Sequence, residues 1–207
     1  VPFPIDSLRL TPNGQKMLIQ QSANSAGSAS LHMVDARSGA ELYTVSLIQA
    51  TAGPNFDTGS FEFSPDGSEF TTVDGRIWRT SDGQQLGALP SAGYDPIVRY
   101  SPTGSLILVG RKIFRRSNLI QVGLVRSYAS GQESLDANPY GGAEFLDENR
   151  LVWTGYGRPW IVNFAEQTAT ACEGTIPEYW ARGVCRNANQ TTFVVAGRDS
   201  MRVFRSA

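Results

Sequence analysis

Few side chains in this sequence of 207 residues could support nucleophilic chemistry. His32 is the only histidine, and it lies in Leu31-His32-Met33-Val34, an alternating run that is typical of a β-strand. Catalysis by a Ser-His-acid relay needs the histidine beside both a serine and a carboxylate. No nucleophile motif accompanies His32, so we interpret it as a structural or exposed strand residue. We predict no catalytic residue and no enzyme activity.

Metal and cofactor sites are not predicted either. One histidine and the distant Cys172 and Cys185 are too few ligands for a usual zinc site, and no calcium-loop pattern occurs. Gly155-Tyr156-Gly157 is a fragment of a dinucleotide fingerprint, but no helix is expected after it, so we interpret it as a turn. Asp147 and Glu148 fall in a predicted hairpin turn, where we expect solvated carboxylates.

The composition favours an all-β chain with many turns and argues against two classes of partner. Hydrophobic residues make up 41% of the sequence, which also has 21 glycines and 11 prolines. A formal net charge of −1 lacks the positive field that general nucleic-acid binding needs. No apolar run approaches the length needed to cross a bilayer, so we expect no membrane insertion.

The two cysteines bear on the cellular compartment. Cys172 and Cys185 could form a disulfide in an oxidising compartment or remain two free thiols, because their spacing does not determine their geometry. The chain also begins at Val1 without an initiator methionine, as it would after removal of a leader or as an excised fragment. These features slightly favour an extracytoplasmic or secreted location over a cytoplasmic one.

A strand-turn-strand pattern recurs along the chain. Ser64-Pro65-Asp66-Gly67 follows the alternating run 61–63, and similar turns stand at 11–14 and 101–104. Proline fixes φ early in the turn and glycine supplies a positive φ, so each copy predicts an antiparallel hairpin. Weaker copies stand at 145–149 and 184–189, where asparagine replaces glycine.

A second pattern marks the end of a third strand in each unit. Met33–Gly39 matches Ile77–Gly83, and both match Val125–Gly131; residues 161–167 are a looser copy. One four-stranded unit per about 40 residues is the spacing of a β-propeller.

In these two patterns the chain resembles the WD-repeat family, and the sequence Phe63-Ser64-Pro65-Asp66-Gly67 is typical of that family. Asp35 and Trp78 each keep one residue of the signature dipeptide. The Gly-His pair that usually precedes the first strand is absent, so we do not expect the family's hydrogen-bond network.

The resemblance implies an all-β fold, a β-propeller of about five four-stranded antiparallel blades in a single domain over 1–207. We expect blades at approximately 7–47, 60–90, 96–136, 143–174 and 183–207. The last blade ends on a third strand, Val203–Ala207, so either closure is imperfect or the chain is part of a larger propeller, which we favour.

The resemblance also implies a non-catalytic interaction module or scaffold that binds a protein or peptide partner through loops on a propeller face. One alternative is a secreted, lectin-like, carbohydrate-binding propeller. Another is a propeller module of an enzyme, completed by another segment or chain. A segment from another chain or a missing region could also supply the absent strand of the last blade.

Two kinds of residue are predicted to bind the partner. The basic stretch 111–118 is either a long insertion with an exposed aromatic residue, suited to an acidic peptide or a phosphate, or a solvated extended hairpin, which we favour. The second kind consists of aromatic residues of the inter-blade loops, together with Tyr156 and Arg158 of the link between the second and third strands of the fourth blade. Tyr, Trp and Arg are the residues enriched at binding hot spots. The full set is Tyr94, Arg111, Lys112, Phe114, Arg115, Arg116, Tyr140, Tyr156, Arg158, Tyr179 and Trp180.

Overall fold

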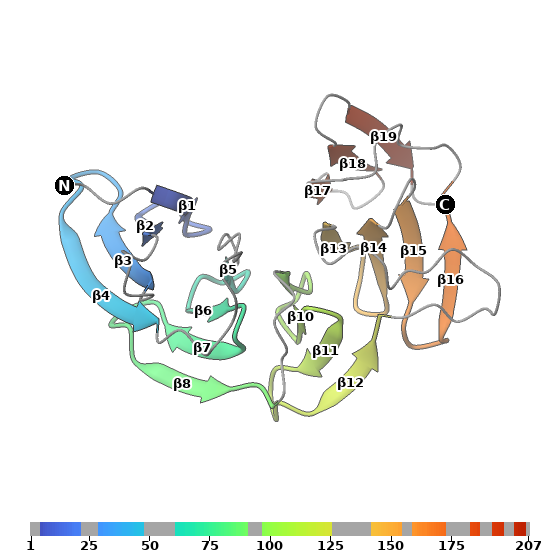
Figure 1. Cartoon of the computed structure of the whole chain (residues 1–207), viewed down its shortest axis with the longest axis horizontal. Helices are drawn as coiled ribbons and strands as arrows, with labels where there is room; N and C mark the ends of the chain where they lie inside the picture. The colour runs from blue at the N-terminus through green and yellow to red at the C-terminus, as the bar shows by residue number, and fades with distance from the viewer. Residues whose placement is uncertain are drawn as a thin grey trace. The chain divides into compact units, whose positions relative to one another are not determined.

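The structure is a computed structural model, and it describes residues 5–21, 29–47, 61–90, 97–125, 142–154, 159–172, 183–186, 192–196 and 201–205. All regular elements in these ranges are β-strands (Figure 1). The chain divides into two compact units, Val1–Val98 and Arg99–Ala207, which are described one at a time. The single domain over 1–207 stays a prediction.

The first unit contains two four-stranded antiparallel sheets, each built from strands that follow one another in the chain. Sheet 1 consists of β1 (Ile5–Leu10), β2 (Lys16–Gln21), β3 (Ala29–Asp35) and β4 (Glu41–Leu47). Sheet 2 consists of β5 (Phe61–Phe63), β6 (Glu69–Thr72), β7 (Arg76–Arg79) and β8 (Gln85–Ala88).

The second unit repeats this arrangement, beginning at the unit boundary. Sheet 3 consists of β9 (Val98–Tyr100), β10 (Leu106–Val109), β11 (Lys112–Arg115) and β12 (Gln121–Leu124). Sheet 4 consists of β13 (Ala143–Phe145), β14 (Arg150–Thr154), β15 (Pro159–Asn163) and β16 (Thr168–Ala171). Sheet 5 has three strands in the described residues, β17 (Gly183–Arg186), β18 (Thr192–Ala196) and β19 (Met201–Arg205).

The predicted hairpin turns at 11–14, 64–67, 101–104 and 145–149 are confirmed, whereas residues 187–189 of the fifth copy lie outside the described residues. In sheet 2 the backbone N–H of Ser64 donates to the carbonyl of Glu69, and that of Gly67 to the carbonyl of Ser64, both at 2.9 Å. Gly67 has a φ of +71°, the left-handed conformation that glycine adopts at little cost. The Asp66 carboxylate accepts the Ser64 hydroxyl at 2.6 Å and the Ser68 N–H at 3.0 Å, which closes the turn.

The hairpin of sheet 4 is held by a carboxylate instead of a glycine. Asp147 accepts the backbone N–H groups of Asn149 and Arg150, both at 2.8 Å. The Arg150 guanidinium also donates to the same carboxylate at 2.7 Å. These bonds explain why this turn forms without the Pro-Gly pattern.

The two sheets of the first unit pack through an apolar cluster. It consists of Leu18, Leu31, Met33 and Val45 of sheet 1 with Phe61, Phe63, Phe70 and Trp78 of sheet 2. Polar contacts join the same sheets at their edges: Arg9 pairs with Glu62 at 2.7 Å, and the Tyr43 hydroxyl donates to the Thr80 carbonyl at 2.9 Å. Burial of the cluster is the main force that holds the two sheets together.

Sheets of the second unit also pack in chain order. Leu146 and Val152 of sheet 4 contact Phe193 and Val195 of sheet 5 in one apolar cluster. Between sheets 3 and 4, Arg99 pairs with Glu144 at 3.4 Å.

The hairpin turns of sheets 3 and 4 are joined by Glu148. Its carboxylate accepts the backbone N–H of Thr103 at 3.1 Å, the Thr103 hydroxyl at 2.9 Å and the Ser105 hydroxyl. Burial opposes ionisation of Glu148, but these hydrogen bonds outweigh it and lower the pKa of the carboxyl. Glu148 is therefore a bridging residue between blades, and the expectation of a merely solvated turn residue is wrong.

The architecture confirms the predicted all-β fold of four-stranded blades and the three-stranded last blade. One assignment within sheet 3 is wrong. The third strand is β11 (Lys112–Arg115), which pairs with β10 and β12, and not the segment around Val125. The sequence around 111–118 is therefore part of the blade, and not a long insertion.

Candidate interaction surface

The candidate surface is centred on β11. Val109 pairs with Lys112, so Gly110-Arg111 is a tight hairpin between β10 and β11. Arg111 and Lys112 therefore lie at the end of sheet 3 that carries this link, which we call the link end. Both side chains are partly exposed.

Arg115 and Arg116 lie at the opposite end of the same strand. The backbone N–H of Arg116 donates to the carbonyl of Ser105, in the hairpin turn between β9 and β10, at 2.8 Å. Because β11 has four residues, the two ends are about 10 Å apart along the strand. The predicted basic cluster is thus divided into two pairs of cations at opposite ends.

Phe114 is not an exposed aromatic residue. It points into the packing of sheet 3 and is 0% exposed, so the prediction that it presents a ring to a partner is wrong. Ile113 and Phe114 are consecutive residues of β11 and both are buried, so this strand does not alternate between a buried and an exposed face. The partner-binding role of the four cations stays a prediction.

Arg111 lies against the neighbouring sheet 4. Its guanidinium is 6.0 Å from the ring centroid of Trp153, a cation–π distance. Trp153 pairs with Trp160 across β14 and β15, and the two side chains are 1% and 3% exposed. Within the described residues the indole N–H of Trp153 has no hydrogen-bond partner. At the link end of sheet 3, Arg111 therefore lies against the buried ring of Trp153, and Lys112 follows Arg111 in the chain.

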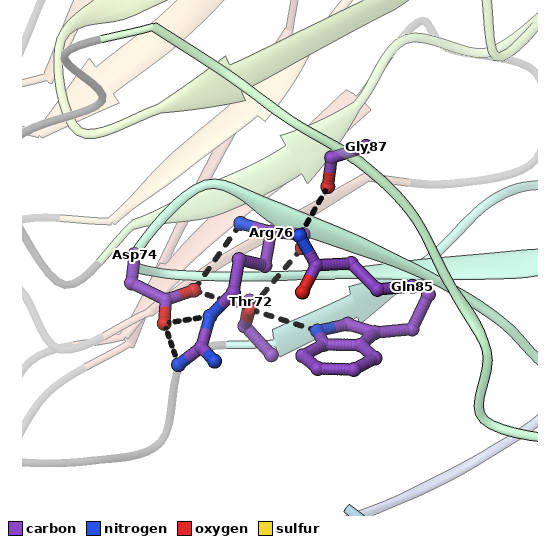
Figure 2. Close-up of polar contacts among 6 residues, drawn as sticks. Thr72, Asp74, Arg76, Gln85 and Gly87 are labelled. Atoms are coloured by element: carbon purple, nitrogen blue, oxygen red, sulfur yellow. Dashed lines mark hydrogen bonds and ion pairs between the residues drawn. The ribbon is translucent and has the colours of Figure 1, made fainter. Parts of the chain in front are cut away.

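Sheet 2 has a related arrangement at the corresponding link, residues 73–75 (Figure 2). The indole N–H of Trp78 donates to the Thr72 hydroxyl at 3.3 Å, and that hydroxyl donates to Asp74 at 2.5 Å. Asp74 also binds the Arg76 guanidinium at 2.6 Å, and this guanidinium lies 5.4 Å from the Trp78 ring centroid. A tryptophan-centred network is thus present in this blade despite the missing Gly-His pair.

His32 has polar neighbours that the sequence did not reveal. Its Nε2 lies 2.7 Å from the Ser30 hydroxyl and its Nδ1 lies 2.8 Å from the Glu41 carboxylate. The Thr44 hydroxyl donates to Glu41 at 2.9 Å and lies 3.0 Å from Nδ1. The histidine therefore lies beside both a serine and a carboxylate, contrary to expectation.

The remaining predicted residues divide into two groups. Tyr94, Tyr140, Tyr156, Arg158, Tyr179 and Trp180 lie outside the described residues. Cys172 is a free, partly buried thiol, and burial raises its pKa to about 11; the side chain of Cys185 is not described. The disulfide between them stays a prediction.

Neither a metal-binding cluster nor a membrane-spanning helix occurs in the described ranges. No group of three or more His, Cys, Asp or Glu side chains there is arranged to hold a metal ion. Nor do those ranges contain a helix long and apolar enough to cross a membrane.

Solved structures with the same fold are found across the whole chain. U3-55K superposes at a TM-score of 0.69 with 14% identity, covering 99% of this chain and 62% of that one. The RRP9 WD40 repeats superpose at 0.69 with 14% identity, covering 99% of this chain and 61% of that one. The fold is that of WD40 β-propellers.

A functionally unknown protein from Desulfotomaculum acetoxidans DSM 771 also superposes, at a TM-score of 0.68 with 13% identity, covering 99% of this chain and 66% of that one. The chain spans less than two thirds of the length of each of these three solved chains. No family model and no curated protein sequence matches it. The likeness therefore concerns the fold, and function has to be argued from the residues.

Proposed function

We propose that the chain is a non-catalytic interaction module that binds an acidic peptide segment of a partner protein at the link end of sheet 3. The observation that carries the proposal is the position of Arg111, held 6.0 Å from the Trp153 ring centroid and next to Lys112 in the chain. Guanidinium groups recognise carboxylates through paired hydrogen bonds, and Arg and Trp are enriched at binding hot spots.

The geometry favours one end of β11 over the other. At the link end, the ring of Trp153 limits the freedom of Arg111, which reduces the entropy lost on binding. Arg115 is exposed at the other end without a described aromatic neighbour. A partner carboxylate should therefore gain more from Arg111 and Lys112 than from Arg115 and Arg116.

The carbohydrate-binding alternative receives little support from the described tryptophans. Trp78, Trp153 and Trp160 are 7%, 1% and 3% exposed, so their faces pack against protein and are not open to a sugar ring. No described observation favours the alternative of an enzyme module completed by another chain.

A strand-completing segment belongs to the proposal as a second mode of binding. Met201 and Val203 of β19 are 70% and 67% exposed, and sheet 5 has three strands in the described residues. An extended partner segment could add to β19 through backbone hydrogen bonds. Such binding would slow amide exchange in β19, whereas unchanged exchange in the presence of the partner would count against it.

Selection from a phage-displayed random peptide library tests the peptide-binding proposal. We expect the selected peptides to be rich in Asp and Glu. The double variant Arg111→Glu/Lys112→Glu should bind the best of them at least about tenfold more weakly, which corresponds to about 1.4 kcal/mol. Arg115→Glu/Arg116→Glu is the matched control, since it places the same charge change at the other end of β11.

Two outcomes of the selection would refute the proposal. One is a set of binders without acidic residues. The other is an equal loss of affinity in both double variants, because a general charge effect would then explain the binding without a site at the link end.

An extracytoplasmic or secreted location also remains a proposal. Support for this location would come from a disulfide between Cys172 and Cys185, which would form by oxidation of the free Cys172 thiol in an oxidising compartment. Alkylation of the native-purified, denatured protein without reductant should leave both cysteines unmodified, as intact mass would show. Two alkylated cysteines would contradict the disulfide and remove this support for the location.

A further inference from the structure

The polar cluster around His32 lies on the face of sheet 1 that points away from sheet 2. Side chains alternate along a strand, and Leu31 and Met33 face sheet 2 in the apolar cluster. Ser30 and His32 therefore share the other face. Thr44 of β4 stands opposite His32 on that face, and Ile19 of β2 flanks it on the other side.

The hydrogen bonds of the cluster are consistent with one arrangement of protons. The four polar side chains concerned are Ser30, His32, Glu41 and Thr44. The Thr44 hydroxyl donates to Oε1 of Glu41, so Nδ1 of His32 carries the proton that is shared with Oε2 of Glu41. Nε2 then has a free lone pair, and the Ser30 hydroxyl donates to it over 2.7 Å. Hydrogen bonds from His32 and then from Thr44 lower the pKa of Glu41, which keeps it a carboxylate near neutral pH.

We propose that Ser30 is a base-activated nucleophile that accepts an acyl group from an activated carboxylic ester. Ser30 Oγ attacks the carbonyl carbon while Nε2 of His32 takes the hydroxyl proton. The tetrahedral intermediate then expels the alcohol or phenol, which leaves with the proton from Nε2. One C–O bond breaks and one forms, with no change in oxidation state.

The acyl group should remain on Ser30 after this step. Ser30 lies in the central strand β3, paired with Gln21 on one side and Ser46 on the other. Its backbone is engaged in the sheet, so its N–H is not available as a donor to a developing oxyanion. Hydrolysis of the acyl-serine would have to form a second tetrahedral oxyanion, this time from an ester that is not activated. We therefore expect stoichiometric modification of Ser30 instead of turnover.

Small apolar acyl groups fit the surroundings of Ser30. Ile19 stands beside His32, and Leu8 of β1 stands beside Ile19 on the same face. Leu8 is 55% exposed, so an apolar surface accessible from solvent adjoins the cluster. An acyl chain could cover part of this surface and gain from its burial.

Reaction with p-nitrophenyl acetate tests the proposal. Release of p-nitrophenol should be limited to about one equivalent, and peptide mass spectrometry should find the acetyl group on Ser30. His32→Gln retains a hydrogen-bonding side chain but cannot act as the base, so acetylation of Ser30 should slow by about 100-fold. Ser46, an exposed serine opposite Ser30, is the internal control and should stay unmodified.

Glu41 acts through His32 and is a positioning residue. Glu41→Gln should slow acetylation without changing the thermal unfolding midpoint, and Glu41→Asp should restore part of the rate. This pair also gives a second test if His32→Gln does not fold. The proposal is overturned if Ser30 is not acetylated, if Ser46 is acetylated equally, or if the folded His32 or Glu41 variants react as fast as the unchanged chain.

Discussion

Trp78 and Trp153 are two buried tryptophans, each with an arginine near its ring, that differ in their hydrogen bonding. The Trp78 N–H donates to Thr72 at 3.3 Å, and Thr72 in turn binds Asp74. The Trp153 N–H has no partner among the described residues. A buried donor without an acceptor loses its hydration without compensation, so the two indoles should contribute differently to stability.

Replacement of each tryptophan by phenylalanine measures this difference. Both variants lose packing volume in a buried position, which is destabilising. Trp78→Phe also removes a hydrogen bond, whereas Trp153→Phe removes an unpaired donor. We expect Trp78→Phe to lower the free energy of unfolding by at least about 1 kcal/mol more, measured by urea denaturation. Equal losses, or a larger loss for Trp153→Phe, would contradict the assignment.

Glu148 makes stability depend on pH. Its folded-state pKa lies below the ordinary value of 4.5, so its contribution is complete above that value and is lost as the pH falls through the lowered pKa. Glu148→Gln should lower the unfolding midpoint at pH 7 and should reduce its decline below about pH 5. Calorimetry at several pH values measures both effects.

Glu166→Gln is the control for this experiment, since Glu166 is an exposed residue of another turn in sheet 4. Its pH profile should follow that of the unchanged chain. A Glu148→Gln profile that also does so would show that the bridge between the two hairpin turns contributes nothing.

At the scale of the element, one position decides the turn between the third and fourth strands. Gly39 and Gly83 have φ of +71° there, and Leu119 and Gln167 have φ of +57° in sheets 3 and 4. Residues other than glycine rarely adopt this conformation. The turns after β11 and β15 thus lack the glycine that marks those of sheets 1 and 2. For sheet 3 the sequence pattern therefore favours the later Ser130-Gly131.

The two glycines allow a matched substitution. Alanine at either position is strained by the positive φ, at a cost of about 1–2 kcal/mol. A Cβ on Gly83 would also lie 2.7 Å from the Tyr43 ring, whereas on Gly39 it would meet nothing within 4 Å. We expect Gly83→Ala to be more destabilising than Gly39→Ala by about 1–3 kcal/mol in chemical denaturation. Similar losses would contradict the packing of Tyr43 against this turn.

The elements were predictable to the extent that local residues determine them. Ser64-Pro65-Asp66-Gly67 and its copies predicted the hairpins because proline and glycine act within the turn itself. The cluster at His32 was not predictable, since Glu41 approaches from another strand and a register shift between Met33 and Val34 alters its position. Similarly, Phe114 is buried although it stands in a run of cations, and a local pattern does not reveal that burial.

At the scale of the whole molecule, the first strands of neighbouring sheets carry a repeated charge arrangement. Arg9 of β1 pairs with Glu62 of β5 within the first unit at 2.7 Å. Arg99 of β9 pairs with Glu144 of β13 within the second unit at 3.4 Å. Sheets 1 and 2 are thus joined by an apolar cluster and an ion pair, sheets 3 and 4 by an ion pair, and sheets 4 and 5 by an apolar cluster. Contacts between successive sheets therefore recur along the chain, as expected for a fold built from repeated units.

The central functional claim is that a partner binds at the link end of sheet 3. Hydrogen–deuterium exchange of the chain, with and without its selected acidic peptide, tests it most directly. We expect slower exchange at residues 109–112 in the complex and unchanged exchange at residues 115–120. Protection confined to residues 115–120, or no protection in sheet 3 at a saturating concentration of peptide, would contradict it.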